Sequence, residues 1–352
     1  MSCTRWRALA RIFACVMPLL PTPASGALTP AQIGVIANTA SKDSLEIARY
    51  YIERRGIPAG NLITVSLPTT DPVLTRDKFA VIKAEVDRKT PPHVQAYALA
   101  WTEPFRAGCM SITTAFAAGF DERFCGGVCQ GTRPLPYFNS DTGTPWDTYR
   151  IRPTMALAGK SVAEVKALID RGISSDGMAP AGTAYLLSTT DKARNVRATG
   201  FPAIVERLGS RVKIERISAN SIENRQDVMF YFTGRTHVDK LATLKFLPGA
   251  IADHLTSAGG VLTGENKQMR SLDWLSAGAT GSYGTVVEPC AFTAKFPAPG
   301  IVMRRYLDGE TLIEAYWKSV AQPGQGIFIG EPLAAPYRTP ELSRRAGADT
   351  LK

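Results

Sequence analysis

The sequence predicts an α/β fold with a mainly parallel sheet of about seven or eight strands and helices on both faces. Three observations support this prediction. Apolar, β-branched runs alternate with amphipathic segments from residue 27 onward. The first five segments follow the order strand, helix, strand, helix, strand, which favours parallel strands joined by right-handed crossovers. The run "TVV" at residues 285–287 lacks polar alternation, as expected for a strand covered on both faces.

The first third of the chain supplies two strand–helix pairs and a third strand. A strand is expected at residues 32–38. Apolar residues then recur at helical spacing over residues 44–55, until Gly56 and Pro58 stop the helix. The next elements are expected as a strand at 61–68, a helix at 75–89 and a strand at 95–101.

Residues 105–152 break this rhythm. The segment holds three of the four cysteines that follow residue 26, adjacent glycines at 126 and 127, and few periodic apolar positions. Long excursions of this kind are usually functional or held by disulfides. We therefore expect a disulfide-rich insertion over one edge of the sheet.

Regular alternation resumes after the insertion. Ser161 and Glu164 form a capping-box pattern at the start of a helix over residues 161–173. Further strands are expected at 182–190, 212–218, 227–234, 259–264, 281–287 and 326–332. Further helices are expected at 248–256, 268–277, 300–307 and 311–320. These elements predict a single domain over residues 27–336 and a loose tail at 337–352.

Residues 1–26 have the features of a secretory signal peptide. Arginines at positions 5, 7 and 11 precede a short apolar core, and small residues at 24–26 offer a cleavage site. The formal charge of +10 falls to 38 − 31 = +7 once these three arginines are removed. Lysine and arginine are spread through the chain, so a solvated basic surface is favoured over a nucleic-acid site. We expect a periplasmic or secreted protein with no transmembrane segment after cleavage.

Four cysteines remain after residue 26, and an even count in an oxidising compartment predicts two disulfides. No histidine lies near the C-x3-C pair, so a zinc site is not expected there. Sequence alone allows three pairings. We expect Cys125 to pair with Cys129, because the short loop is easy to close, and Cys109 with Cys290, which would join two strand ends.

Polar side chains follow several expected strands and could share the carboxyl edge of the sheet. Converging acids could bind a metal ion, a sugar or a basic peptide, or act as an acid/base pair. Alternatively, some of them cap the helices that follow. The candidate ligand-binding residues are Asn38, Ser41, Glu103, Asp191 and Glu265, with Glu288 as a candidate catalytic acid.

Among the histidines, His237 lies near a predicted strand end and could act as a general base beside a carboxylate or hydroxyl. A thiol enzyme made of Cys290 and His237 would need a reduced thiolate, and export favours a disulfide instead. Motifs for phosphate loops, dinucleotides, zincins and α/β-hydrolases do not occur. No cofactor or nucleic-acid partner is therefore expected.

Several long runs resemble an uncharacterised family of exported bacterial proteins that occurs in genomes encoding the exosortase protein-sorting system. The runs are "MSITTAFAAGF", "YFNSDTG", "AGTAYLLSTTDKARNVRA", "FLPGAIADHLTSAGGVLTG", "WLSAGATGSYGTVVEPC" and "GETLIEAYWKSVAQPGQGIFIGEPLA". The resemblance implies a secreted bacterial protein and no established activity.

The order of strands and "TG" turns is also similar to the gingipain and caspase-like peptidase fold, or more broadly to flavodoxin-like layering. In those peptidases a histidine follows one strand and a cysteine nucleophile follows the next. The matching positions here are Thr233-Gly234 and Thr263-Gly264, so both dyad residues are missing.

Two function classes follow from the sequence. The first is an envelope-associated binding or accessory protein, linked to exosortase-type surface-protein or polysaccharide systems, whose partner is an envelope glycan or an exported protein. The alternative is a peptidase-like or glycan-directed hydrolase that uses His237 or acids at the sheet edge.

Overall fold

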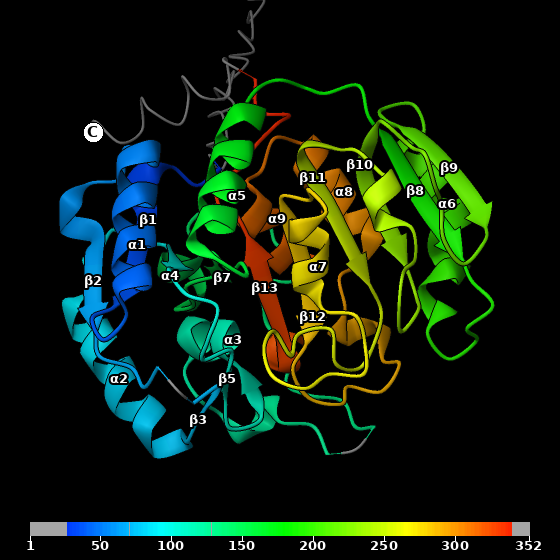
Figure 1. Cartoon of the computed structure of the whole chain (residues 1–352). Coiled ribbons are helices and arrows are strands. Elements are labelled where there is room, and N and C mark those ends of the chain that lie inside the picture. Colours follow the sequence, from blue (N-terminus) through cyan, green and yellow to red (C-terminus); the bar gives the residue numbers. More distant parts are fainter. Residues whose placement is uncertain (1–26, 70, 128, 340–352) are drawn as a thin grey trace, which may run out of the picture.

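The computed structural model describes residues 27–69, 71–127 and 129–339. The expected signal peptide and residues 340–352 of the expected tail lie outside these described residues. The architecture is the expected one, a large sheet covered by helices on both faces (Figure 1). The sheet has ten strands within the described residues, in the order β2-β1-β4-β7-β13-β12-β11-β10-β8-β9. A small second sheet has the order β3-β5-β6.

The strands are β1 (Ile33–Asn38), β2 (Leu62–Val65), β3 (Val73–Leu74), β4 (Ala96–Leu99), β5 (Arg106–Ala107), β6 (Met110–Ser111), β7 (Thr154–Ala156), β8 (Thr183–Ser188), β9 (Lys213–Ser218), β10 (Val228–Thr233), β11 (Phe246–His254), β12 (Gly281–Thr285) and β13 (Gly326–Gly330). The helices are α1 (Lys42–Arg55), α2 (Arg76–Lys89), α3 (Ile112–Ala118), α4 (Pro145–Tyr149), α5 (Val162–Ser175), α6 (Phe201–Leu208), α7 (Ser271–Ser276), α8 (Pro299–Leu307) and α9 (Leu312–Trp317). In Figure 1, α1, α5 and α7 lie in front of the sheet, and α8 and α9 lie behind it.

Capping residues fix the ends of the long helices. Ser41 accepts a hydrogen bond from the backbone N–H of Ser44 at the start of α1, and Ser161 accepts one from Glu164 at the start of α5. Gly56 ends α1 at φ 63°, a left-handed conformation that glycine adopts without steric cost. The apolar face of each helix then packs on the sheet.

One expected helix is wrong, because residues 248–256 belong to strand β11 and its end. β11 lies between β10 and β12, and its residues 249–254 are all buried. A strand covered on both faces loses the polar alternation that distinguishes it from a buried helix. His254 therefore ends a strand.

The expected strand at 259–264 is also wrong. These residues form turns, and Gly260 passes so close to β12 that a Cβ on it would lie 2.5 Å from the carbonyl oxygen of Gly284. Glycine is needed here for a close approach of two backbones. Glu265 consequently does not follow a strand.

The expected strand over residues 281–287 forms as β12, which ends at Thr285 and is buried throughout. It pairs parallel with β11 and antiparallel with β13. β13 pairs parallel with β7, so the antiparallel pairing of β12 with β13 is what interrupts the otherwise parallel large sheet within the described residues.

The insertion differs from the expectation in position. Its helix α3 is almost wholly buried and packs on β4, β7 and β13 in the middle of the sheet, not over an edge. No helix within the described ranges is long and apolar enough to cross a membrane.

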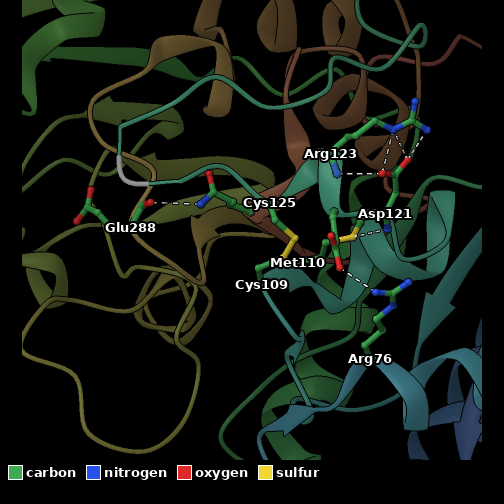
Figure 2. Close-up of a disulfide and its surroundings, with 9 residues drawn as sticks. Arg76, Cys109, Met110, Asp121, Arg123, Cys125 and Glu288 are labelled. Atoms are coloured by element: carbon green, nitrogen blue, oxygen red, sulfur yellow. Dashed lines mark hydrogen bonds and ion pairs between the residues drawn. A yellow bond between two sulfur atoms is a disulfide. The ribbon is translucent and has the colours of Figure 1, made fainter.

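The four cysteines form two disulfides, but the expected pairing is wrong. Cys109 pairs with Cys125 and Cys129 with Cys290, with Cα atoms 5.5 Å and 5.0 Å apart. The insertion folds Cys125 against the β5–β6 hairpin that carries Cys109, as Figure 2 shows. Cys129 therefore pairs with Cys290, in the segment after β12. The short C-x3-C spacing was therefore a poor guide, since the fold of the insertion decides which cysteines meet.

Candidate functional site

A cleft of about 520 Å³ opens where the loops after β1, β4 and β7 meet the loop after β11; we call it the switch-point cleft. The chain runs from β1 outward to β2 and then returns to β4 on the other side of β1. Such a reversal leaves a crevice at the carboxyl ends of the two strands, the common position of ligand sites in open α/β sheets. Its polar lining consists of Asn38, Ser41, Asp43, Ser44, Thr69, Thr102, Glu103, Lys160, Ser161, Thr263 and Arg270.

Asn38 organises one wall of the cleft. Its side-chain oxygen accepts hydrogen bonds from the backbone N–H groups of Ala40 and Leu67, at 3.0 and 2.9 Å, and its amide donates to the Leu67 carbonyl. The Asn38 backbone N–H donates to the Ser44 hydroxyl at 2.8 Å. Asn38 thus ties the end of β1 to the end of β2, and its role is to position the wall.

Glu103 forms the opposite wall, in the loop after β4. Its Oε2 accepts a hydrogen bond from the Thr263 hydroxyl, which belongs to the loop after β11. No described residue donates a hydrogen bond to Glu103 Oε1. The half-buried carboxylate therefore keeps one oxygen available to a ligand.

Charges of both signs surround the cleft. Asp43 is exposed on the first turn of α1, and Lys160 precedes α5 with its ammonium 2.8 Å from a carboxylate oxygen of Asp273. Arg270 precedes α7 and donates to the Gly264 carbonyl. Because α1 and α5 both begin at this cleft, their N-terminal N–H groups add positive potential.

The lining provides acceptors, donors and hydroxyls, but no histidine or cysteine among the described residues. No group of three or more histidine, cysteine, aspartate or glutamate side chains in the described ranges could hold a metal ion. The arrangement suits multiple hydrogen bonds to a polar ligand.

The structure brings three predicted site residues, Asn38, Ser41 and Glu103, to one cleft but leaves the other acids elsewhere. Strand order explains the separation. Strands β7 and β13 lie between β4 and β12, and neighbouring strands are about 4.8 Å apart. β12 therefore does not neighbour β4, and it runs antiparallel to β13, which is parallel to β7, so the acids that follow β4 and β12 do not converge.

Asp191 and Glu288 lie near a smaller recess of about 140 Å³, which we call the Arg194 recess. Asp191 follows β8 and holds Arg194 with a carboxylate–guanidinium distance of 3.1 Å. Glu288 is exposed at the rim, and its Oε1 accepts the backbone N–H of Cys290 at 2.7 Å. Both acids thus have local structural partners. Glu265 is exposed in the loop after β11 and lines neither pocket.

His237 is exposed in the loop after β10, on a shallow recess that also contains Asp239 and Asp273. Its ring makes no hydrogen bond with any described residue, so the geometry does not assign it a partner for general-base chemistry.

The other two histidines are structural. His93 contacts the Asn61 side chain at 3.0 Å. His254 is buried; its Nδ1 accepts from the Trp274 indole at 2.8 Å, so its Nε2–H donates to the Met269 carbonyl. Burial lowers the pKa of His254 to about 4, which keeps the ring neutral.

Sequence reasoning missed Asp43, Lys160, Thr263 and Arg270 as parts of the cleft. Lys160 follows β7, a strand of three residues too short to be recognised from its pattern. Thr263 and Arg270 come from the loop after β11, which was hidden by the wrong assignments at 248–264. Among these four residues, only Lys160 had a sequence signal beside it, which was the capping-box pattern that begins at the next residue.

No protein-family model matches the chain. No curated protein matches it either, so nothing here supports the link to the exosortase system. Some solved structures resemble it weakly, among them the following two. A protease has a TM-score of 0.45 and 11% identity, over 89% of this chain and 80% of the protease chain. The Saccharomyces cerevisiae separase–securin complex has a TM-score of 0.38 and 9% identity, over 84% of this chain and 20% of that chain. Likenesses at this level carry no argument about activity.

Both sequence positions matched by resemblance to the peptidase dyad lack its residues, and one of them does not follow a strand in the structure. β10 ends at Thr233 as expected, but the next strand is β11, so the position first matched to Thr263-Gly264 moves to the residues after His254. Those residues are Leu255, Thr256 and Ser257. A cysteine is absent there too, and Cys290 is held in a disulfide.

Proposed function

We propose that this protein is exported and binds a glycan fragment of the cell envelope in the switch-point cleft, without converting it chemically. The observation that carries the proposal is Glu103, which lines the cleft with one carboxylate oxygen free of described partners. A carboxylate in this state accepts hydrogen bonds from sugar hydroxyls, and such charge-assisted bonds are among the stronger polar contacts.

The rest of the lining supports a hydroxyl-rich ligand. The Ser41 hydroxyl accepts the Ser44 N–H and can still donate, and the Thr263 hydroxyl donates to Glu103 and can still accept, whereas Lys160 and Arg270 can only donate. This mixture fits a ligand that carries both donors and acceptors on every side, as sugars do. Two disulfides support maturation in an oxidising compartment, which is consistent with export.

Binding can be measured by isothermal titration calorimetry with three defined trisaccharides: tri-N-acetylglucosamine, trigalacturonate and maltotriose. We expect saturable binding of at least one. Glu103→Gln should weaken it about ten-fold, the usual loss for one hydrogen bond to a charged group. Glu265→Gln, which alters an exposed acid outside the cleft, should leave the affinity unchanged.

Three outcomes would overturn the proposal. The first is no saturable binding of any probe, and the second is equal losses of affinity in the Glu103 and Glu265 variants. The third is cleavage of a bound probe over time, detected by chromatography, which would favour the hydrolase alternative; His237→Asn would then show whether the loop after β10 takes part.

A further inference from the structure

A second and larger cavity, of about 720 Å³, lies between α6 and α8; we call it the α6–α8 cavity. It lies apart from the switch-point cleft and shares no lining residue with it. Its walls are mainly apolar, formed by Phe138, Val196, Ile204, Phe296, Pro297 and Ile301.

Apolar surface is concentrated at this place. Phe138 lines the cavity and is 37% exposed, and Phe292, 39% exposed, directly precedes the lining residue Thr293. These are two of the five large hydrophobic side chains that are exposed among the described residues. Exposed apolar side chains that gather at a concavity are typical of binding sites.

The charge of the lining has one sign. Arg197, Arg207 and Arg304 line the cavity, whereas no aspartate or glutamate does so within the part of the chain described. Arg197 is neutralised by Asp253 at 2.6 Å, and Arg304 is held by the Asn139 side chain at 2.7 Å. Arg207 is exposed and makes no hydrogen bond or ion pair with a described residue.

Arg207 is placed to receive an anion at the mouth of the cavity. Ala203 and Arg207 are one turn apart on α6, so both lie on the side that lines the cavity. Ile204 and Leu208 are buried beneath them and contribute to the apolar wall. A single ligand could thus place an apolar body along α6 and an acidic group at Arg207.

From this combination we infer that the α6–α8 cavity binds an aliphatic carboxylate, a fatty-acid-like molecule whose chain packs on the apolar walls and whose carboxylate pairs with Arg207. The volume lies within the range of about 300–1,000 Å³ typical of single small-ligand pockets. A concave site of this size favours one amphiphile over a flat membrane surface or a second copy of the chain.

Displacement of cis-parinaric acid, followed by its fluorescence, tests the inference with dodecanoate and its neutral analogue dodecanol. We expect the concentration of dodecanoate that displaces half of the probe to be about ten-fold lower than that of dodecanol. Arg207→Gln should remove that difference, because it deletes the charge and leaves the apolar walls intact. Arg216→Gln, an exposed arginine on the edge strand β9 outside the cavity, is the matched control and should retain the preference.

Ala203→Trp fills the cavity from an exposed helix position and should abolish the saturable binding of cis-parinaric acid, while circular dichroism reports an unchanged fold. The inference fails if parinaric acid does not bind saturably, or if dodecanol competes as well as dodecanoate. It also fails if the Arg216 variant loses the preference as Arg207→Gln does. Concentration-dependent dimerisation that blocks the cavity without any amphiphile binding would assign this face to a second copy instead.

Discussion

Polar residues at strand ends have different roles in the two halves of the sheet. At the switch-point cleft, Glu103 keeps a carboxylate oxygen free and Asp43 is exposed. In the C-terminal half, Asp191 is paired with Arg194, and the buried Asp253 with Arg197. The difference teaches that a polar residue after a strand indicates a ligand-binding site only where its side chain still has a hydrogen-bonding atom or charge without a partner inside the protein.

Of the two disulfides, the one between Cys129 and Cys290 should contribute more to the free energy of unfolding, because it joins residues 161 apart in the chain whereas Cys109 and Cys125 are 16 apart. The chain-entropy model then predicts a loss of about 5 kcal/mol for the Cys129→Ala/Cys290→Ala pair and about 3 kcal/mol for the Cys109→Ala/Cys125→Ala pair. Urea unfolding of both double variants measures the two losses. The reverse order would show that strain or residual unfolded structure outweighs loop length.

Arg197→Met should destabilise the protein by about 3–5 kcal/mol, because it leaves the Asp253 carboxylate buried without a counter-charge. Burial already raises the pKa of Asp253, and Arg197 opposes that shift. Adding Asp253→Leu should recover most of the loss, since both charges are then removed. Arg197 also donates hydrogen bonds to the backbone carbonyls of Pro297 and Thr233, and a double variant no more stable than Arg197→Met would mean that these bonds dominate.

His254 should make stability depend on pH. Its native pKa is about 4 and its unfolded pKa is about 6.5, so between these values the unfolded chain binds a proton that the native protein does not. The stabilisation is complete above pH 6.5 and is lost as pH falls toward 4, by on the order of 3 kcal/mol. Urea unfolding at pH 7.5 and 4.5 should show a smaller drop for His254→Gln than for the original chain. Equal drops would place the proton uptake on other groups.

Glu288→Gln should change stability by about 0.5 kcal/mol or less, because the amide oxygen can still accept the Cys290 N–H and the side chain is exposed. Trisaccharide binding should be unaffected. A loss of trisaccharide binding would show that the Arg194 recess is part of the ligand-binding site. The acids in the two halves of the sheet would then not differ in role.

Glu103→Gln should have the smallest effect on stability, again within about 0.5 kcal/mol, since the Thr263 hydroxyl can donate to an amide oxygen. Its ligand affinity should nevertheless fall about ten-fold. Thermal melting and calorimetry on the same sample separate the two quantities. A large drop in melting temperature would make Glu103 a structural residue like the acids of the C-terminal half.

The sequence by itself determined the type of most elements. Helical spacing, the capping-box pattern at Ser161 and the stop at Gly56 are local signals, and α1 and α5 form close to where these signals place them, although the cap at Ser41 was not predicted. The buried run of β12 and the presence of two disulfides also followed from the sequence. Asn38, Ser41 and Glu103 follow expected strands, so the sequence predicted that they share one edge of the sheet, and they line one cleft in the structure.

Only the tertiary structure decided which of these pieces meet. Strand order separates Glu103 from Glu288, and the fold of the insertion brings Cys125 to Cys109. Burial on both faces concealed β11, and with it the loop that supplies Thr263 and Arg270 to the cleft. The physical reason is that periodicity and capping depend on residues a few positions apart. Adjacency in a ten-stranded sheet depends instead on packing between residues far apart in the chain.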